Sequence, residues 1–288
     1  MLKKRIVATL LIKDGIVVQS VGFKRYLPVG KPAIAVEFLN NWGVDEIILL
    51  DISATRNGCP PDYAMVKSAS VHCRVPLTVG GGIIHIDHVS ELMHCGADKV
   101  AFNQAALYQP NLITKVAQLF GDQCVVASID GILTNVGHQV YDYWQRKALN
   151  QTPADLAIQL QALGAGEILI NSVDRDGSYQ GFDRMLIDSV CAAVTLPVIC
   201  CGGAGHPKHF VEVFQRTHVS AAAAANFFHF TEHSVTTTKA LINQHISVRH
   251  ETYFDYQDSH FGADGRLLKR DDRELEDMLF VRIQKEVI

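Results

Sequence analysis

The chain contains eight apolar runs of strand length, and segments with helical periodicity separate them. The runs are continuously apolar, which is typical of strands buried on both faces of a parallel sheet. The intervening segments place apolar residues at i, i+3 or i+4, as helices covering such a sheet do. Eight such units favour closure into an α/β (β/α)8 TIM barrel. The predicted strands are 5–12, 45–52, 76–82, 99–103, 124–130, 166–173, 197–203 and 220–226.

The structural alternative is a doubly wound open sheet. It is disfavoured because no G-x-G-x-x-G turn follows the first strand.

The two halves of the chain resemble each other at a spacing of roughly 120 residues, as a search for internal repeats shows. WGVDEIILLDI at 42–52 matches LGAGEILINSV at 163–173, and PLTVGGGI at 76–83 matches PVICCGGAG at 197–205. This pattern indicates two duplicated (β/α)4 halves. It predicts two equivalent ligand sites at the rim where the strands end.

The barrel is expected to occupy residues 1–250, and a charged extension follows at 251–288. A hydrophobic content of 48% with 19% charged residues suits a chain that buries one large core. In the extension, helical spacing predicts a helix docked on the barrel, with an arm for a partner as the alternative. Its apolar positions are Leu275, Met278, Leu279 and Ile283.

Charge and cysteine content bear on partners and compartment. A formal net charge of -4 provides no general attraction to nucleic acid or to an anionic membrane. The seven cysteines form no C-x-x-C pair, which favours a reducing cytoplasmic setting. The first apolar run is too short for a signal peptide or a membrane span. We expect a cytoplasmic protein that binds neither nucleic acid nor membrane.

Glycines follow two repeat-related strands, as Gly81-Gly82 and as Gly202-Gly203. Backbone N–H groups at such turns hold phosphate without a cationic side chain. Glycines can also serve only the turn itself, but their recurrence in both halves favours phosphate binding. Other small or polar residues at the strand ends are Asp176, Gly177, Ala225, Asn226 and Asn103. For the two asparagines, helix capping alone is the alternative.

Carboxylates also stand where strands end. Asp51 and Asp130 close two strands, and Asp174 and Asp176 lie just beyond a third. Each is a candidate general acid or base, and a cap or an ion pair is the alternative. Acid–base chemistry is favoured for Asp130, because Gly131 follows it and no capping box is present.

We expect neither a metal nor a cofactor. The histidine pairs lack a converging third ligand, and neither Cys200 nor Cys201 has a partner base that would make it a nucleophile.

Four charged residues begin different strands: Arg5, Glu46, Lys99 and Glu167. Two cations and two anions at the same end of a barrel predict a ring of ion pairs across its floor. Charges at this end usually serve stability.

Seven segments, taken in order, resemble the cyclase subunit of imidazole glycerol phosphate synthase over residues 1 to about 250: KRIVATLLIKDGIVV, DEIILLDISA, PLTVGGGI, GADKVAFNQAA, GEILINSVDRDGS, PVICCGGAG and AAAAANFFHF. The resemblance implies a heterodimer with a glutamine amidotransferase, the glutaminase, whose ammonia passes through the barrel to the rim. It also implies a substrate with a phosphate at each end.

The resemblance implies specific roles. One phosphate would bind at Gly82 and Asn103, and the other at Asp176, Gly177, Gly203, Ala225 and Asn226. The floor ring would be a gated ammonia entrance, and Asp98 would face the glutaminase.

One position departs from the family in a way that changes the chemistry. The family ends its first strand with C-L-D-V-K-D-G and uses the first Asp as half of a catalytic pair, whereas this chain has T-L-L-I-K-D-G. Leu11 takes that place and cannot transfer a proton, so Asp130 is the remaining carboxylate. Further departures at the barrel mouth are Gln19, Gln104, Asn171 and Cys201.

Three functions follow as alternatives. The first is a cyclase of the histidine pathway. The second is a paralogue that conducts ammonia for amidation of a surface-polysaccharide sugar, which Leu11 favours. The third is a non-catalytic, phosphate-binding activator of the glutaminase.

Overall fold

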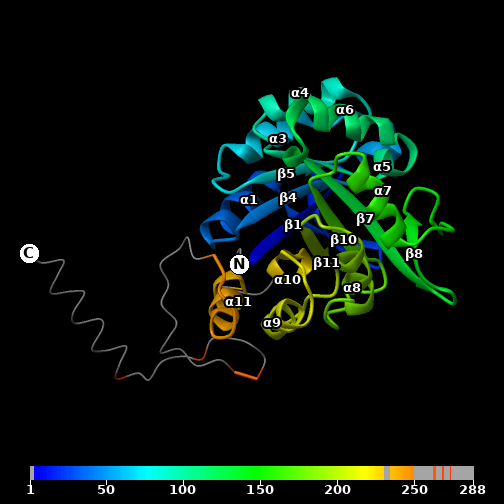
Figure 1. The fold of residues 1–288 in the computed structure, drawn as a ribbon. Coiled ribbons are helices and arrows are strands. Elements are labelled where there is room, and N and C mark those ends of the chain that lie inside the picture. The colour runs from blue at the N-terminus through cyan, green and yellow to red at the C-terminus, as the bar shows by residue number, and fades with distance from the viewer. Residues whose placement is uncertain (1–2, 230–233, 250–261, 264–267, 269–272, 274–288) are drawn as a thin grey trace, which may run out of the picture.

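The computed structural model describes residues 3–229, 234–249, 262–263, 268 and 273. In this part of the chain eight parallel strands close into a barrel (Figure 1). The last strand pairs with the first, with Arg5 opposite Ala221, so the (β/α)8 prediction is confirmed and the open sheet is excluded. In order around the barrel, the strands are β1 (Arg5–Lys13), β4 (Glu46–Asp51), β5 (Leu77–Gly80), β6 (Lys99–Phe102), β7 (Val125–Thr134), β10 (Glu167–Ser172), β11 (Val198–Cys201) and β12 (Ala221–Ala224).

Helices surround the barrel and bury their apolar faces on it (Figure 1). Four of them begin with proline in the first turn, where its missing N–H leaves no bond unmade. The principal helices are α1 (Pro32–Asn41), α3 (Tyr63–Ser70), α4 (Ile86–His94), α6 (Pro110–Phe120), α7 (Pro153–Ala162), α8 (Arg184–Ala193), α9 (Pro207–Arg216) and α11 (Ser234–Asn243). Shorter turns are α2 (Ala54–Asn57), α5 (Gln104–Tyr108), η1 (Asp122–Cys124) and α10 (Asn226–His229).

Two hairpins extend the barrel beyond what the sequence analysis predicted. β2 (Ile16–Val21) and β3 (Arg25–Gly30) follow β1, whereas β8 (Gly137–Asp142) and β9 (Lys147–Ala148) follow β7. β1 and β7 are equivalent strands of the two halves, so the duplication includes the hairpins. The first was detectable: Asp14-Gly15 separates two apolar runs, and both residues have positive φ, 52° and 77°, as a type I′ turn requires.

The core has two parts. A large cluster lies between the outer faces of the strands and the helices. A smaller one fills the barrel interior with Val7, Ile48, Ala101, Val126, Leu169, Ile199, Ala221 and Ala223. Each fully buried aliphatic side chain contributes roughly 1.5–3 kcal/mol. Alternation along each strand sends one set of side chains inward and the other outward.

The helix α11 packs beside α9 and is tied to the floor end of the barrel by an ion pair. The Lys239 Nζ lies 2.6 Å from the Asp45 Oδ1, and both side chains are buried. Asp45 also accepts a 2.7 Å bond from the Ile6 N–H, and Lys4 bridges to Val248. Residues as far as Val248 thus pack with the barrel.

The helix predicted in the extension 251–288 lies outside the described residues. Within the described part, every helix is too short or too polar to span a bilayer.

Candidate active site at the barrel rim

A cavity of about 610 Å³ opens where the barrel strands end. It gathers several of the predicted residues from different strands and the loops after them: Leu11, Asp51, Gly81, Gly82, Asn103, Asp130, Asp176 and Ala225. Gln104, Asn171 and Cys201 line it too, whereas Gln19 is buried on β2. The predicted residues Gly177, Gly202, Gly203 and Asn226 lie outside its lining.

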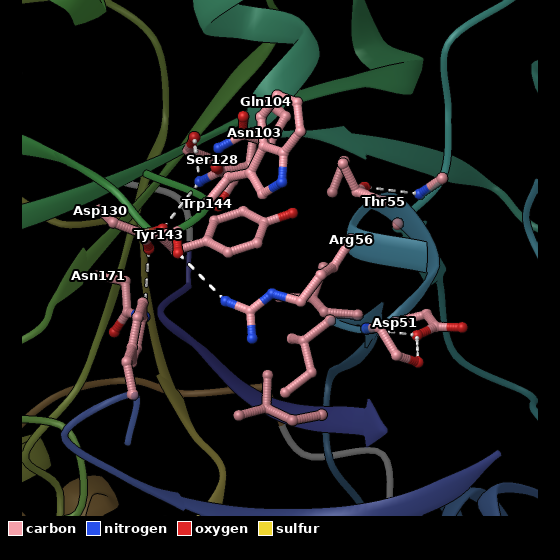
Figure 2. A pocket seen from close by; sticks show the side chains of 18 of the residues that line it. Asp51, Thr55, Arg56, Asn103, Gln104, Ser128, Asp130, Tyr143, Trp144 and Asn171 are labelled. Carbon is pink, nitrogen blue, oxygen red and sulfur yellow. Dashed lines mark hydrogen bonds between the residues drawn. The ribbon is translucent and has the colours of Figure 1, made fainter. Parts of the chain in front are cut away.

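Asp130 on β7 is the best-placed acid–base group of the cavity. Its side chain is 6% exposed, and two amides flank it (Figure 2). The Asn103 Nδ2 donates to one carboxylate oxygen at 3.0 Å, and the Asn171 Nδ2 donates to the other at 3.5 Å. Burial raises the pKa of Asp130 to about 7 against the opposing effect of these two bonds. Both protonation states are therefore populated near neutral pH.

The other candidate carboxylates serve local structure. Asp51 accepts bonds from the Ser53 N–H and hydroxyl, at 2.8 and 2.6 Å, at the start of α2. Asp174 accepts from the Leu133 N–H at 2.7 Å. Asp176 accepts from the Ser20 hydroxyl at 2.6 Å. Leu11 lines the cavity without any proton to transfer.

The side chains of the two asparagines bond to other groups of the rim. The Asn103 side chain makes no capping bond and instead donates to Asp130 and to the Ser128 carbonyl, so the capping alternative for Asn103 is wrong. The Asn226 amide donates to the Ser20 carbonyl at 2.6 Å and accepts from the Ser20 N–H at 3.2 Å. Asn226 therefore holds the β2–β3 hairpin.

The glycine pairs have a steric reason to be glycine. A Cβ at Gly81 would lie 2.2 Å from the Asp51 carbonyl oxygen, and one at Gly203 would lie 2.1 Å from that of Gly181. Both glycines have φ near 100°, a left-handed conformation that L side chains rarely adopt. The Gly82 N–H donates to the Thr55 hydroxyl at 3.1 Å. Turn geometry thus accounts for these glycines, and phosphate binding stays a prediction.

The two halves of the rim differ. In the second half the β2–β3 hairpin contacts the residues that were predicted to bind phosphate. The Gly22 N–H of this hairpin donates to the Asp176 carbonyl at 3.1 Å. The Phe23 N–H donates to the Asp176 carboxylate at the same distance, and Gly177 packs against Ser20. In the first half Gly81, Gly82 and Asn103 face the cavity.

At the opposite end of the barrel, the four predicted charges form a closed ring. Glu46 and Glu167 alternate with Arg5 and Lys99, and the Lys99 Nζ lies 3.0 and 2.8 Å from the two carboxylates. Burial lowers the pKa of Lys99, but the two glutamates outweigh it, so the net shift is upward. The Thr78 hydroxyl adds a 3.0 Å bond to Glu46. The predicted ion-pair ring is confirmed, and its role as an ammonia entrance stays a prediction.

Asp98 lies next to this ring. Its carboxylate accepts the Leu77 N–H at 2.8 Å, at the start of β5.

Cys200 and Cys201 are poor nucleophiles in this fold. Burial raises the pKa of Cys200 far above its usual range and that of Cys201 to about 12, so neither is a thiolate at neutral pH. Among the described residues, no three His, Cys, Asp or Glu side chains gather as metal ligands would.

The sequence analysis missed an aromatic and cationic wall of the cavity. It is formed by Arg56 of α2 and by Tyr141, Tyr143, Trp144 and Arg146 of the β8–β9 hairpin. The sequence analysis did not predict the β8–β9 hairpin, so it could not place the residues of that hairpin at the rim.

A TIM barrel with a buried acid–base group at the C-terminal ends of its strands has the arrangement of a barrel enzyme. The family model described as "Histidine biosynthesis protein" matches residues 5–234. The chain belongs to the HisF family, as its relatives show.

The chain is 40% identical over 258 residues to the "Putative imidazole glycerol phosphate synthase subunit hisF2" of Vibrio vulnificus, covering 89% of this chain and 95% of the relative. It is 38% identical to the "Imidazole glycerol phosphate synthase subunit HisF" of Bacillus pumilus and 40% identical to that of Clostridium botulinum. Both matches cover 86% of this chain and 100% of the relative.

Proposed function

We propose that the protein is a cyclase-type, lyase-class subunit of an imidazole glycerol phosphate synthase-like complex. It receives ammonia through the barrel from a glutamine amidotransferase and adds it to a phosphorylated substrate at the rim. One observation carries this proposal: the floor ring, the apolar barrel interior and Asp130 follow one another from floor to rim. The names of the relatives support it.

The physical chemistry of the interior suits ammonia. Neutral ammonia enters an apolar layer at a far lower cost in free energy than ammonium, which would have to be desolvated as an ion. The ring at the floor consists of charged groups that bind one another, so a passage there opens when an ion pair separates.

At the rim, Asp130 supplies the proton transfers. When the ammonia nitrogen bonds to a carbonyl carbon, the C=O π bond breaks, the nitrogen becomes positively charged and the oxygen negatively charged. An ionised Asp130 takes a proton from the nitrogen and passes it to the oxygen, which becomes a hydroxyl group. A second transfer of the same kind breaks the C–O bond, so that water leaves and a C=N bond forms. A pKa of about 7 makes both forms available.

The ammonia route is tested by comparing two nitrogen sources in the complex with the glutaminase. We expect Lys99→Met to lower glutamine-dependent product formation at least tenfold. Activity with an ammonium salt, which reaches the rim from solution, should stay within twofold of the wild-type value. Loss of both activities would indicate that the variant has misfolded. Arg5→Lys, which keeps the charge of the ring, is the control for that outcome. Equal glutamine-dependent rates in wild type and Lys99→Met would contradict the proposal.

Leu11 favours a second candidate function, in which ammonia is used to amidate a surface-polysaccharide sugar. With one carboxylate at the mouth, cyclisation by a two-carboxylate route is impaired. We expect the bis-phosphate ribulosyl intermediate and ammonium to react on this protein at least a hundredfold more slowly than on a relative with both aspartates. Rapid formation of imidazole glycerol phosphate would exclude this candidate. Glutaminase stimulation without any ammonia-dependent product would instead support a non-catalytic activator.

A further inference from the structure

An apolar stripe, formed by Ile34, Phe38 and Trp42, runs along the outer surface of α1. Ile34 is 51% exposed and Phe38 is 54% exposed, and Trp42 at the end of the helix is half-buried. The three residues are four apart in sequence, so their side chains form one row along the helix. The Phe38 and Trp42 rings meet edge to face with their centroids 6.1 Å apart. Single exposed apolar side chains are ordinary, whereas a continuous row with two aromatic rings marks a contact surface.

The stripe lies on the flank of α1 that is turned away from α3. α1 packs against α3, and the Asn40 side chain accepts the Arg74 N–H at 2.7 Å just after α3 ends. Successive residues of an α-helix are rotated by about 100°, so Asn40 and Trp42 lie on opposite flanks. On the other side of β1 the covering helix is α11, which packs against α9 (Figure 1). The stripe is therefore turned toward the side of the barrel where β1 and α11 lie.

The described chain leaves the barrel at the floor end of α1. The Lys4 N–H donates to the Ser247 carbonyl at 3.4 Å, and Val248 is bridged to Lys4 and fully buried. The Ile6 N–H, two residues further along β1, donates to the carboxylate of Asp45, which follows α1. Alternate N–H groups of a strand point to the same side. Val248 therefore lies on the α1 side of β1, and the extension starts beside the last turn of α1.

The extension has an apolar row of matching length, formed by Leu275, Met278, Leu279 and Ile283. Their spacing is that of one face of a helix. The row spans eight residue steps, as the apolar stripe of α1 does, so each measures about 12 Å. A helix this short is marginal in water and needs a surface to pack on. Residues 250–274 can span about 80 Å when extended, so the length of the chain does not limit where the row can dock.

The extension is an addition to the barrel of the family. The family model ends at residue 234, and the Bacillus pumilus relative is matched over its whole length by 86% of this chain. Most of the extension therefore has no counterpart in that relative. An added segment that starts beside an apolar stripe is held near it at a high effective concentration, which favours it over a separate molecule.

We propose that the apolar row of the extension docks as a helix on the apolar stripe of α1 in the same chain. The helix covers the side of the barrel, so the rim cavity and the ion-pair ring at the floor both stay accessible. Asp277 and Gln284, which fall on the opposite face of this helix, point to solvent. The proposal is independent of the reaction at the rim and of the ammonia route.

Trp42 reports on the docking by fluorescence. The chain has two tryptophans, so Trp144→Phe leaves Trp42 as the single reporter. In this background we expect Leu279→Asp to raise the acrylamide quenching constant of Trp42 at least twofold, because the aspartate displaces the helix from the indole. Gln284→Asp adds the same charge on the opposite face and is the matched control, with unchanged quenching. Equal quenching with and without Leu279→Asp would overturn the proposal.

Hydrogen exchange of the full-length chain, followed by mass spectrometry, observes the docked helix itself. Phe38→Asp should speed exchange of the amides at 275–283 at least tenfold. Ile158→Asp on α7 is the matched control, because Ile158 is 48% exposed and lies within another helix, and it should leave those amides protected. Wild-type exchange of the barrel strands in both variants shows that they are folded. Unprotected amides at 275–283 in the wild type would refute the docking.

The same measurement separates this occupant from two others. We expect protection of 275–283 to be independent of protein concentration and of added glutaminase. Protection that appears only as the protein dimerises, measured by light scattering, would assign the row to a second copy of the chain. Protection that appears only with the glutaminase would make the extension an arm for that partner. Either result would overturn the proposal.

Discussion

At the scale of single residues, Asp130 combines a functional position with a cost in stability. Its pKa in the folded protein is about 7, above the ordinary value of 3.8, because burial disfavours the carboxylate. The folded state therefore holds the proton more tightly than the unfolded state does. The resulting stabilisation is fully present below about pH 4 and is lost as the pH rises through about 7.

A neutral substitute for Asp130 should consequently stabilise the protein in alkaline solution. We expect Asp130→Asn to raise the free energy of unfolding at pH 8 by roughly 1–3 kcal/mol, with no gain at pH 4, and to lower product formation at least a hundredfold. Urea denaturation at the two pH values measures the first effect. An identical change at both pH values would mean that the carboxylate is not held at a raised pKa.

Leu11 is the residue whose replacement should restore a second carboxylate to the mouth. We expect Leu11→Asp to increase turnover of the bis-phosphate ribulosyl intermediate at least tenfold, because a proton donor and an acceptor would then both line the cavity. Leu11→Asn, equal in size but unable to transfer the proton, is the control. Equal rates in the two variants would show that the second carboxylate is not what limits cyclisation.

At the scale of elements, the two hairpins depend on different carboxylates. Asp176 binds the Ser20 hydroxyl and the Phe23 N–H of the first hairpin, and Asp174 binds the Leu133 N–H on the strand that leads into the second. Each hairpin extends a barrel strand, so local opening leaves the barrel core intact.

This division makes a local prediction. Asp176→Ala should speed hydrogen exchange of the Phe23 amide about tenfold or more, since that N–H donates to the Asp176 carboxylate and a bond to a charged acceptor is worth about 1.5–3 kcal/mol. Amides of the barrel strands should keep their protection. Asp174→Ala is the matched control and should leave the first hairpin unchanged. A uniform rise in exchange over all strands would instead indicate global destabilisation.

At the scale of the whole molecule, contacts between distant parts of the chain close the barrel. Lys239 and Asp45 form a buried ion pair across a separation of 194 residues and join α11 to the floor. Removal of one partner of such a pair leaves an uncompensated buried charge.

We therefore expect Lys239→Met to lower the free energy of unfolding by about 3–5 kcal/mol. The double variant Lys239→Met with Asp45→Asn should recover part of this loss, because the asparagine carries no charge and still accepts the Ile6 N–H. Thermal and urea unfolding of the three proteins measures the difference. A double variant less stable than Lys239→Met would contradict the argument.

Several features followed from local pattern. The strands and seven of the principal helices were predicted from periodicity, because a buried strand and an amphipathic helix require different spacings of apolar residues. The floor ring followed as well: Arg5, Glu46, Lys99 and Glu167 begin strands, and parallel strands in a barrel bring their first inward residues together. Asp130 was placed at the mouth by the same reasoning.

Other features required the tertiary structure. The Asp130 pKa depends on burial and on amides from β10 and the end of β6, and Asp176 bonds to a hairpin more than 150 residues away in sequence. The wall of Arg56, Tyr143, Trp144 and Arg146 forms from two loops that meet only in the folded chain. Hydrophobic periodicity reports which face of an element is buried, but it carries no information on which polar groups lie within bonding distance. The barrel and the missing carboxylate at Leu11 were thus determined by the sequence, whereas the partners of each rim carboxylate and the aromatic and cationic wall of the cavity were decided by three-dimensional packing.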